Sequence, residues 1–120
     1  DVHKRQDQYV FIGDETAQPA VLSCIENLNG KKYIGIFETK NKQYVYDLEG
    51  ISDHIKWIYR DDFVQQNEDL VNEIVSLVQK ADNTYIFGAG EGKRMLTLRR
   101  ALKEAGFSTK EINLIGYWKK

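Results

Sequence analysis

The sequence has little of several residue types, and each shortage excludes a class of protein. Cys24 is the only cysteine among 120 residues, which excludes a framework of internal disulfides and favours a reducing compartment. Neither His3 nor His54 has the spacing of a metal-ligand motif, so we expect no metal site. No apolar run approaches the roughly 20 residues of a membrane span, and no signal-peptide pattern opens the chain. We therefore expect a cytoplasmic protein without membrane insertion.

An excess of charge of one sign is also missing. The chain has 17 basic and 18 acidic residues, a formal net charge of −1, so we expect neither nucleic acid nor an anionic membrane as a partner. The hydrophobic share of 42% and the charged share of 29% are typical of a globular domain with one core. The chain begins at Asp1 and not at methionine, and we expect a piece of a longer protein.

Short apolar runs alternate with amphipathic stretches along the chain. This alternation is typical of a parallel α/β sheet. Residues 1–8 are polar and without periodicity, so we expect a tail or linker there, followed by one domain over residues 9–120. The segment from Tyr44 to Leu48 could form a short edge strand or a packed loop. The predicted strands are 9–13, 33–37, 55–59, 84–87 and 112–117, and the predicted helices are 17–28, 68–80 and 93–105. The sequence thus predicts a three-layer parallel sheet of about five strands with helices on both faces.

Two junctions between a strand and a helix carry the small and polar residues of a possible ligand site. The run 84–87 passes into a stretch of small residues from Gly88 to Gly92, which predicts a sharp turn into a basic helix. The run 9–13 passes into the other junction, Gly13 to Pro19, which comes first in the chain and is called the first junction below; there we expect Thr16 to cap the first helix and Pro19 to lie in its first turn. The carboxyl edge of a parallel sheet is where ligands bind in such folds.

The first junction allows two interpretations of its acidic residues. Asp14 and Glu15 would repel a diphosphate by about 4 kcal/mol for each contact at about 4 Å, so with a nucleotide bound they must point away or hold a cation. Thr16, Ala17 and the amides that open the helix would then bind the phosphates. Alternatively, the two carboxylates only complement the helix dipole.

Residues after the second and third strands bear on cofactor preference. Glu38 could accept hydrogen bonds from the adenosine ribose hydroxyls, which favours NADH. Thr39, Lys40 and Lys42, together with Arg60, could instead bind a 2′-phosphate, which favours NADPH. The lysines could equally be solvated surface charges, and the residues alone leave this choice open.

The sequence shows no catalytic set of acid, base or nucleophile. Cys24 lies on the predicted buried side of the first helix, where a small core residue is expected. Arg94 is the one basic residue of the third helix that could reach a ligand at the preceding junction. Gly116 to Lys120 places Tyr117 and Trp118 before two cations at the end of the last strand. The two aromatic rings could cap the core or cover a planar ring from a neighbouring domain.

Four ordered segments carry a resemblance to a known family. The first is GDETAQPA from Gly13 to Ala20, the second is W-I-Y-R from Trp57 to Arg60, and the third is A-G-E from Ala89 followed by L-R-R from Leu98. The fourth is GYWKK from Gly116 to Lys120. These segments resemble the GDETALPA, W-x-x-R, A-G-E with L-R-R, and GYWRR motifs of siderophore-interacting proteins, which are FAD-dependent ferric-siderophore reductases.

The resemblance implies the C-terminal, pyridine-nucleotide-binding half of an enzyme similar to ferredoxin–NADP reductase. Family members carry an N-terminal β-barrel that binds FAD, and nothing in this chain resembles that barrel. In the family, NADPH or NADH passes hydride to FAD, and the reduced flavin passes electrons to the chelated ferric iron, so that iron(II) is released in the cytoplasm. The implied partners are the FAD domain and a ferric siderophore, and we expect the isolated domain to be inactive.

The family pattern also implies roles for individual residues. The loop from Gly13 to Pro19 would bind the nucleotide phosphates, and Ala89 stands where the wider superfamily usually has a cysteine beside the nicotinamide. The departures are Gln18 where the family often has leucine, and lysine in place of arginine after Trp118. The residues expected to bind the phosphates are Gly13, Asp14, Glu15, Thr16 and Ala17, and those expected near the adenosine are Thr39, Lys40 and Arg60. Around the nicotinamide we expect Gly88, Ala89, Gly90, Glu91 and Arg94, and at the flavin Tyr117 and Trp118. Lys119 and Lys120 are expected to attract the ferric chelate.

Two other functions remain open from the sequence. The acidic first junction and the missing three-glycine fingerprint would suit a stand-alone nucleotide- or protein-binding module without redox activity. A flavin reductase of the same superfamily with a different electron acceptor would differ only in the partner that it reduces.

Overall fold

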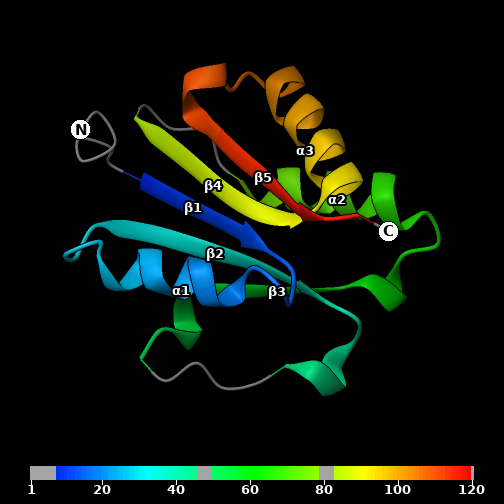
Figure 1. Cartoon of the computed structure of the whole chain (residues 1–120), viewed down its shortest axis with the longest axis horizontal. Coiled ribbons are helices and arrows are strands. Elements are labelled where there is room, and N and C mark those ends of the chain that lie inside the picture. Colours follow the sequence, from blue (N-terminus) through cyan, green and yellow to red (C-terminus); the bar gives the residue numbers. More distant parts are fainter. Residues whose placement is uncertain (1–7, 46–49, 79–82, 120) are drawn as a thin grey trace.

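Five parallel strands form one sheet in the computed structural model, which describes residues 8–45, 50–78 and 83–119 (Figure 1). Their order is β3-β2-β1-β4-β5, so the chain winds outward in one direction from β1 to β3 and then returns to the other side of β1. The switch point of the sheet therefore lies between β1 and β4, where open α/β sheets form a crevice at their carboxyl edge. The strands are β1 (Gln8–Gly13), β2 (Lys32–Thr39), β3 (Ile55–Tyr59), β4 (Thr84–Glu91) and β5 (Ile112–Trp118).

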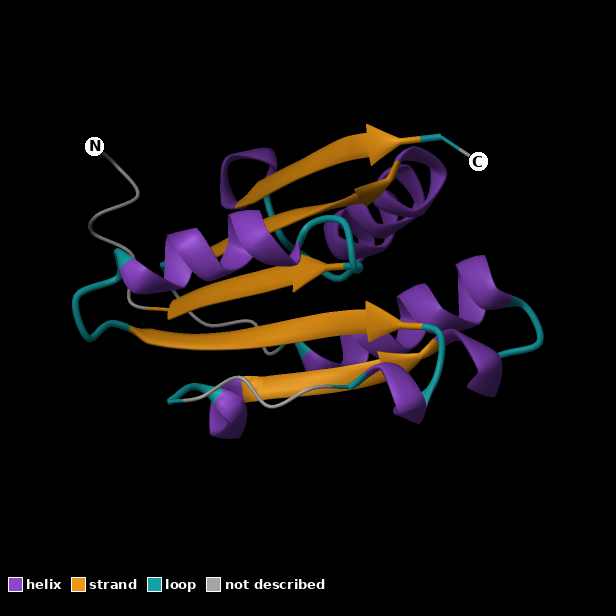
Figure 2. Ribbon diagram, turned by 60° about the horizontal axis from the view of Figure 1, so that its bottom comes forward, coloured by secondary structure: helices purple, strands orange, loops and turns teal. Residues whose placement is uncertain are grey.

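Three helices cover the two faces of the sheet, as the sequence predicts (Figures 1 and 2). The helix α1 (Gln18–Glu26) lies on one face, and α2 (Gln66–Leu77) and α3 (Gly92–Glu104) lie together on the other. The core is accordingly divided into two clusters, because alternate residues of each strand point to opposite faces. The cluster under α1 contains Tyr9, Phe11, Val21, Ile25, Phe37 and Ile55, and the cluster under α2 and α3 includes Val10, Ile12, Ile36, Ile74, Ile86, Leu98 and Leu102.

The prediction of a sharp turn after residue 87 is wrong, because β4 continues through the small residues to Glu91. A Cβ added at Gly88 would lie 2.8 Å from Leu114 Cδ2 and 3.0 Å from the backbone oxygen of Ile12. Gly88 therefore allows the neighbouring strands to approach β4 closely, and the pairing with β5 becomes irregular only between Gly90 and Glu91.

The first helix differs from its prediction at both ends. It begins at Gln18 with Ala17 at the N-cap position, because the amide and hydroxyl of Thr16 are hydrogen-bonded to Asp14 instead. Pro19 lies in the first turn, as expected. The helix ends at Glu26, two residues early, and the chain then turns through Gly30 with a φ of 82°.

Smaller differences concern other element bounds. Gln8 belongs to β1 and not to the expected tail. The second helix spans 66–77 where 68–80 is predicted, and Lys80 lies outside the described residues. Ala105, predicted as the last residue of the third helix, is an exposed C-cap residue. Tyr44 ends a short 3₁₀ turn and is 54% exposed, and Val45 belongs to no strand, while 46–48 of the possible edge strand lie outside the described residues.

Membrane-spanning elements can be assessed only for the part of the chain that the structure describes. No helix there is both long and apolar enough to cross a bilayer, since the longest, α3, has 13 residues.

Candidate functional site

A cavity of about 320 Å³ lies at the carboxyl edge of the sheet. Residues at or just beyond the ends of all five strands contribute to its lining, and α2 and α3 complete it. This is the position at which an open α/β sheet binds its ligand. The lining residues are Asp14, Glu15, Thr16, Glu38, Arg60, Gln66, Glu91, Arg94 and Trp118.

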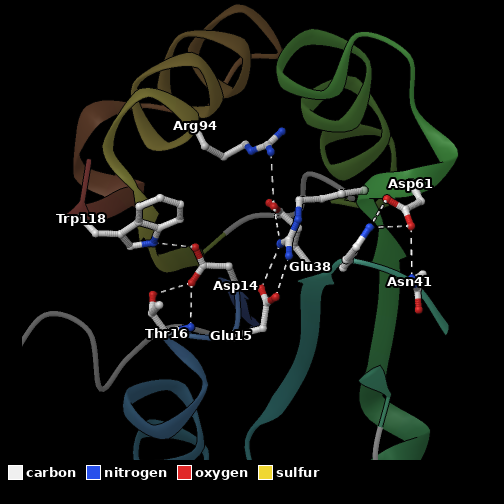
Figure 3. Close-up of polar contacts among 10 residues, drawn as sticks. Asp14, Glu15, Thr16, Glu38, Asn41, Asp61, Arg94 and Trp118 are labelled. Carbon is white, nitrogen blue, oxygen red and sulfur yellow. Dashed lines mark hydrogen bonds and ion pairs between the residues drawn. The ribbon is translucent and has the colours of Figure 1, made fainter. Parts of the chain in front are cut away.

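Asp14 organises the first junction and ties it to the end of β5 (Figure 3). The side chain is 6% exposed, and its Oδ1 accepts hydrogen bonds from the Thr16 amide at 2.9 Å and from the Thr16 hydroxyl. Its Oδ2 accepts a hydrogen bond from Trp118 Nε1 at 3.0 Å. The Ala17 amide also donates to the backbone oxygen of Asp14, at 3.1 Å. The amides of Thr16 and Ala17, which the sequence suggests for phosphate binding, are thus already paired within the loop.

Arg60 is held by two carboxylates, those of Glu15 and Glu38, which are labelled in Figure 3. Its Nη1 and Nη2 donate to the two oxygens of Glu15 at 2.9 and 2.6 Å, a planar two-contact geometry. Nη1 also donates to Glu38 Oε2 at 2.9 Å. Glu38 therefore does not stand free for a ribose in this structure.

A second guanidinium approaches the same oxygen of Glu38. Arg94 Nη2 lies 3.3 Å from Glu38 Oε2, and Arg94 Nη1 donates to the backbone oxygen of Gln66 at 2.6 Å. The side chains of Glu38 and Arg94 are only 9% and 11% exposed. Glu38 is thus the buried anion that joins β2, the segment after β3, and α3.

The two carboxylates on Arg60 have opposite pKa shifts. Hydrogen bonding from Arg60 lowers the pKa of Glu15. Burial raises the pKa of Glu38, although the guanidinium groups of Arg94 and Arg60 oppose this shift. Hydrogen bonding to Glu15 raises the pKa of the Arg60 guanidinium above its ordinary value.

Glu91 caps the N-terminus of α3 with its own side chain. Its Oε1 accepts from the Lys93 amide at 3.1 Å and its Oε2 from the Arg94 amide at 2.7 Å. An acidic residue directly before a helix is a recognisable cap signal, although the expectation for Glu91 was a place around the nicotinamide. The two capped amides cannot bind an anionic ligand at the same time.

Several of the remaining predicted residues are buried. Gly13, Ala17, Gly88, Ala89 and Gly90 are buried in the packing of β1, β4 and α1. At Gly90, an added Cβ would lie 3.0 Å from Asp14 Oδ2, so this glycine makes room for the Asp14 side chain. No described group forms a hydrogen bond with the buried Thr39 hydroxyl.

Lys40 lies outside the cavity lining. Its Nζ is 3.1 Å from Asp61 Oδ1, both side chains are exposed, and Asn41 Nδ2 donates to Asp61 Oδ2 at 3.1 Å. Hydrogen bonds from Asn41 and Lys40 lower the pKa of Asp61. The structure therefore separates Lys40 from the Arg60 network.

The end of β5 presents aromatic and basic groups at the surface. Tyr117 and Trp118 are 46% and 40% exposed. Lys119 helps to line a neighbouring cavity of about 630 Å³ together with Lys93 and Arg94. Lys120 lies outside the described residues. Over the described ranges, no cluster of three histidine, cysteine or acidic residues could hold a metal ion.

Comparisons with known proteins agree with this architecture. The sequence model of the family described as siderophore-interacting protein matches residues 6–120. A siderophore utilization protein from T. fusca is 26% identical, with a TM-score of 0.76 over 95% of this chain and 45% of that one. No curated protein matches by sequence.

Two further solved structures support the fold alone. A siderophore-interacting protein from Acinetobacter baumannii is 21% identical, with a TM-score of 0.71 over 97% of this chain and 47% of that one. Another, from Aeromonas hydrophila, is 19% identical, with a TM-score of 0.75 over 96% of this chain and 52% of that one. The chain thus spans about half the length of each of these proteins.

Proposed function

Because the chain belongs to the siderophore-interacting protein family, we propose that it is the pyridine-nucleotide-binding half of a flavin-dependent ferric-siderophore reductase. The observation that carries this proposal is the crevice at the switch point, into which Arg60 presents a planar pair of donors. An FAD domain in the remainder of the protein and a ferric siderophore would be its partners. The single cysteine supports a cytoplasmic location for the reaction.

The donor set of the crevice fits a phosphate at Arg60. A guanidinium that binds the two oxygens of a carboxylate can bind two phosphate oxygens in the same way. The amides of the first junction fit less well, since those of Thr16 and Ala17 are paired with Asp14. We therefore propose Arg60 as the main phosphate ligand, with the loop from Gly13 to Ala17 as the wall beside it.

The other residues would act around this contact. Thr39 and Lys40 would lie near the adenosine end, and the stretch from Gly88 to Glu91, with Arg94, near the nicotinamide. The exposed aromatic rings of Tyr117 and Trp118 would pack against the flavin ring. Lys119 and Lys120 would attract an anionic ferric chelate. When bound, the nicotinamide supplies the hydride that reduces the flavin, whose electrons then reach the chelated iron.

Titration of the isolated chain with NADPH and NADH, followed by amide chemical shifts, tests the nucleotide site. We expect shifts at 13–17, at Arg60 and at 89–91, because these residues surround the crevice. Titration with adenosine, which lacks phosphate, is the matched control and should move the Arg60 signals much less. If millimolar NADPH and NADH both leave all of these signals in place, the proposed function is wrong.

Arg60→Ala should remove a preference for NADPH over NADH in the flavin-loaded full-length protein. A hydrogen-bonded contact between arginine and phosphate is worth about 1.5–3 kcal/mol, or roughly 10- to 150-fold in the ratio of kcat/KM values. Lys40→Ala should have a smaller effect, because Lys40 is exposed and bound to Asp61. An unchanged ratio in Arg60→Ala would show that Arg60 does not bind the 2′-phosphate.

A binding module without redox activity is the second candidate. The cavity lining contains four carboxylates but only two guanidinium groups, and this acidic lining favours it. Oxidation of NADPH by the flavin-loaded full-length protein with a ferric chelate would exclude this candidate. The same assay with a ferredoxin or haem protein in place of the chelate would reveal a flavin reductase with a different acceptor.

A further inference from the structure

Glu15 and Glu38 bind the same guanidinium but differ in exposure. The Glu15 side chain is 47% exposed, whereas that of Glu38 is 9% exposed. Arg60 donates to both oxygens of the Glu15 carboxylate. Glu38 has a second cation, Arg94, on the same oxygen. Only Glu15 can therefore leave Arg60 and be solvated without moving a buried charge.

The contact with Glu15 uses the face of Arg60 that a phosphate needs. Both Nη atoms of Arg60 donate to Glu15, while Glu38 accepts from Nη1 alone. If Glu15 swings into solvent, Arg60 stays anchored to Glu38 and its Nη2 is free. Exchange of Glu15 for a phosphate costs little, because a half-exposed ion pair is weak and favours the paired state by at most about fivefold.

We propose that Glu15 is an intramolecular competitor that occupies the phosphate-binding face of Arg60 until a nucleotide phosphate displaces it. This inference rests on the proposed function and adds a residue that sets the affinity of the site. The apparent affinity for nucleotide is lowered by the fraction of molecules in which Glu15 holds Arg60. Glu38 has the complementary role of a positioning residue, because it keeps Arg60 at the crevice in both states.

Calorimetric titration of Glu15→Gln with NADPH and NADH tests this inference. Glutamine keeps the size of the side chain but removes its charge, so the variant should bind NADPH about three- to sixfold more tightly than the unmodified chain. A gain limited to NADPH would identify the displacing group as the 2′-phosphate, and an equal gain with NADH would identify it as the diphosphate. Either gain supports the competition.

Two further variants distinguish a specific contact from a general change in charge. Glu26→Gln makes the same change in charge on the exposed end of α1 and should leave the affinity within about twofold. In Glu15→Gln combined with Arg60→Ala the gain should vanish, because it depends on Arg60. Equal gains in Glu15→Gln and Glu26→Gln, or a gain that survives Arg60→Ala, would overturn the inference.

The proposed function and the inference fail in different ways. If the unmodified chain and Glu15→Gln bind NADPH equally well, the competition is wrong and the nucleotide site stands. If none of the proteins binds either nucleotide, the site itself is wrong and the competition falls with it.

Discussion

Replacing Gly88 by alanine should lower the free energy of unfolding by about 2–3 kcal/mol, because the added atom has no space. The new Cβ would lie 2.8 Å from Leu114 Cδ2 and 3.2 Å from Ile12 Cβ. It would also lie 3.0 Å from the backbone oxygen of Ile12, which cannot rotate away as a side chain can. Gly88 pairs with Ile12 of β1 and Leu114 of β5, so relief would require the central strands to separate. Thermal or denaturant unfolding measures this loss.

Gly92→Ala is the matched control for Gly88→Ala. The nearest atom to its added Cβ would be the backbone oxygen of Trp118 at 3.6 Å, an ordinary contact, and Gly92 is the first residue of α3. Its free energy of unfolding should change by no more than about 0.5 kcal/mol. If Gly88→Ala keeps its stability but loses nucleotide binding, the residue serves the approach of a ligand and not the packing of strands.

Glu38→Ala should cost about 3 kcal/mol of unfolding free energy, because it leaves a buried cation without its anion. Arg94 is 11% exposed and would keep only the Gln66 carbonyl as a partner, while Arg60 would keep Glu15. Denaturant unfolding at neutral pH measures the effect. The contrasting variant is Asp61→Ala, which breaks the exposed pair with Lys40 and should leave the stability almost unchanged.

A second substitution tests the cause assigned to Glu38→Ala. Arg94→Met removes the charge but keeps an apolar side chain of similar length, so in the Glu38→Ala background it should recover part of the lost stability. If the double variant is as unstable as the sum of the two single variants, the cost of Glu38→Ala does not come from the unpaired arginine.

The pH dependence of stability gives an independent test of Glu38. Burial raises its pKa above the ordinary value of 4.5, so the folded protein binds this proton more tightly than the unfolded chain. The stability that comes from protonation of Glu38 is therefore full below about pH 4.5 and is lost as the pH rises through the raised pKa, while the ion pairs of the carboxylate remain. The stability of the unmodified protein relative to Glu38→Gln should fall as the pH rises above about 4.5. An increase over that range would mean that the two arginines outweigh burial and lower the pKa.

The strands and helices were largely predictable because their signals are local. Apolar runs of strand length and amphipathic periods identify each element within a short window, and the third strand was predicted with its observed bounds, Ile55–Tyr59. The error at β4 arose because Gly88 and Gly90 are typical of turns. The contacts that require a glycine at position 88 come from Ile12 of β1 and Leu114 of β5, which are distant in sequence.

The candidate site was predictable by its position but not by its contacts. The order of strands and helices indicates a crevice at the carboxyl edge, and the residues of both junctions and Arg60 were expected there. The partners inside the crevice were not, since Glu38 and Arg94 are 56 residues apart and Asp14 and Trp118 are 104 residues apart. No local pattern links such pairs.

By itself, the sequence determined the α/β architecture and the resemblance to its family, and it predicted the edge of the sheet at which the candidate site lies. The physical reason is that hydrophobic periodicity and short motifs depend on neighbouring residues. Only the tertiary structure decided what the charged groups do. It showed that Asp14 closes the first junction, that Glu91 caps α3, and that Glu38 and Glu15 share Arg60. Those pairings depend on burial and on distances across the sheet, which are set only when all five strands have come together.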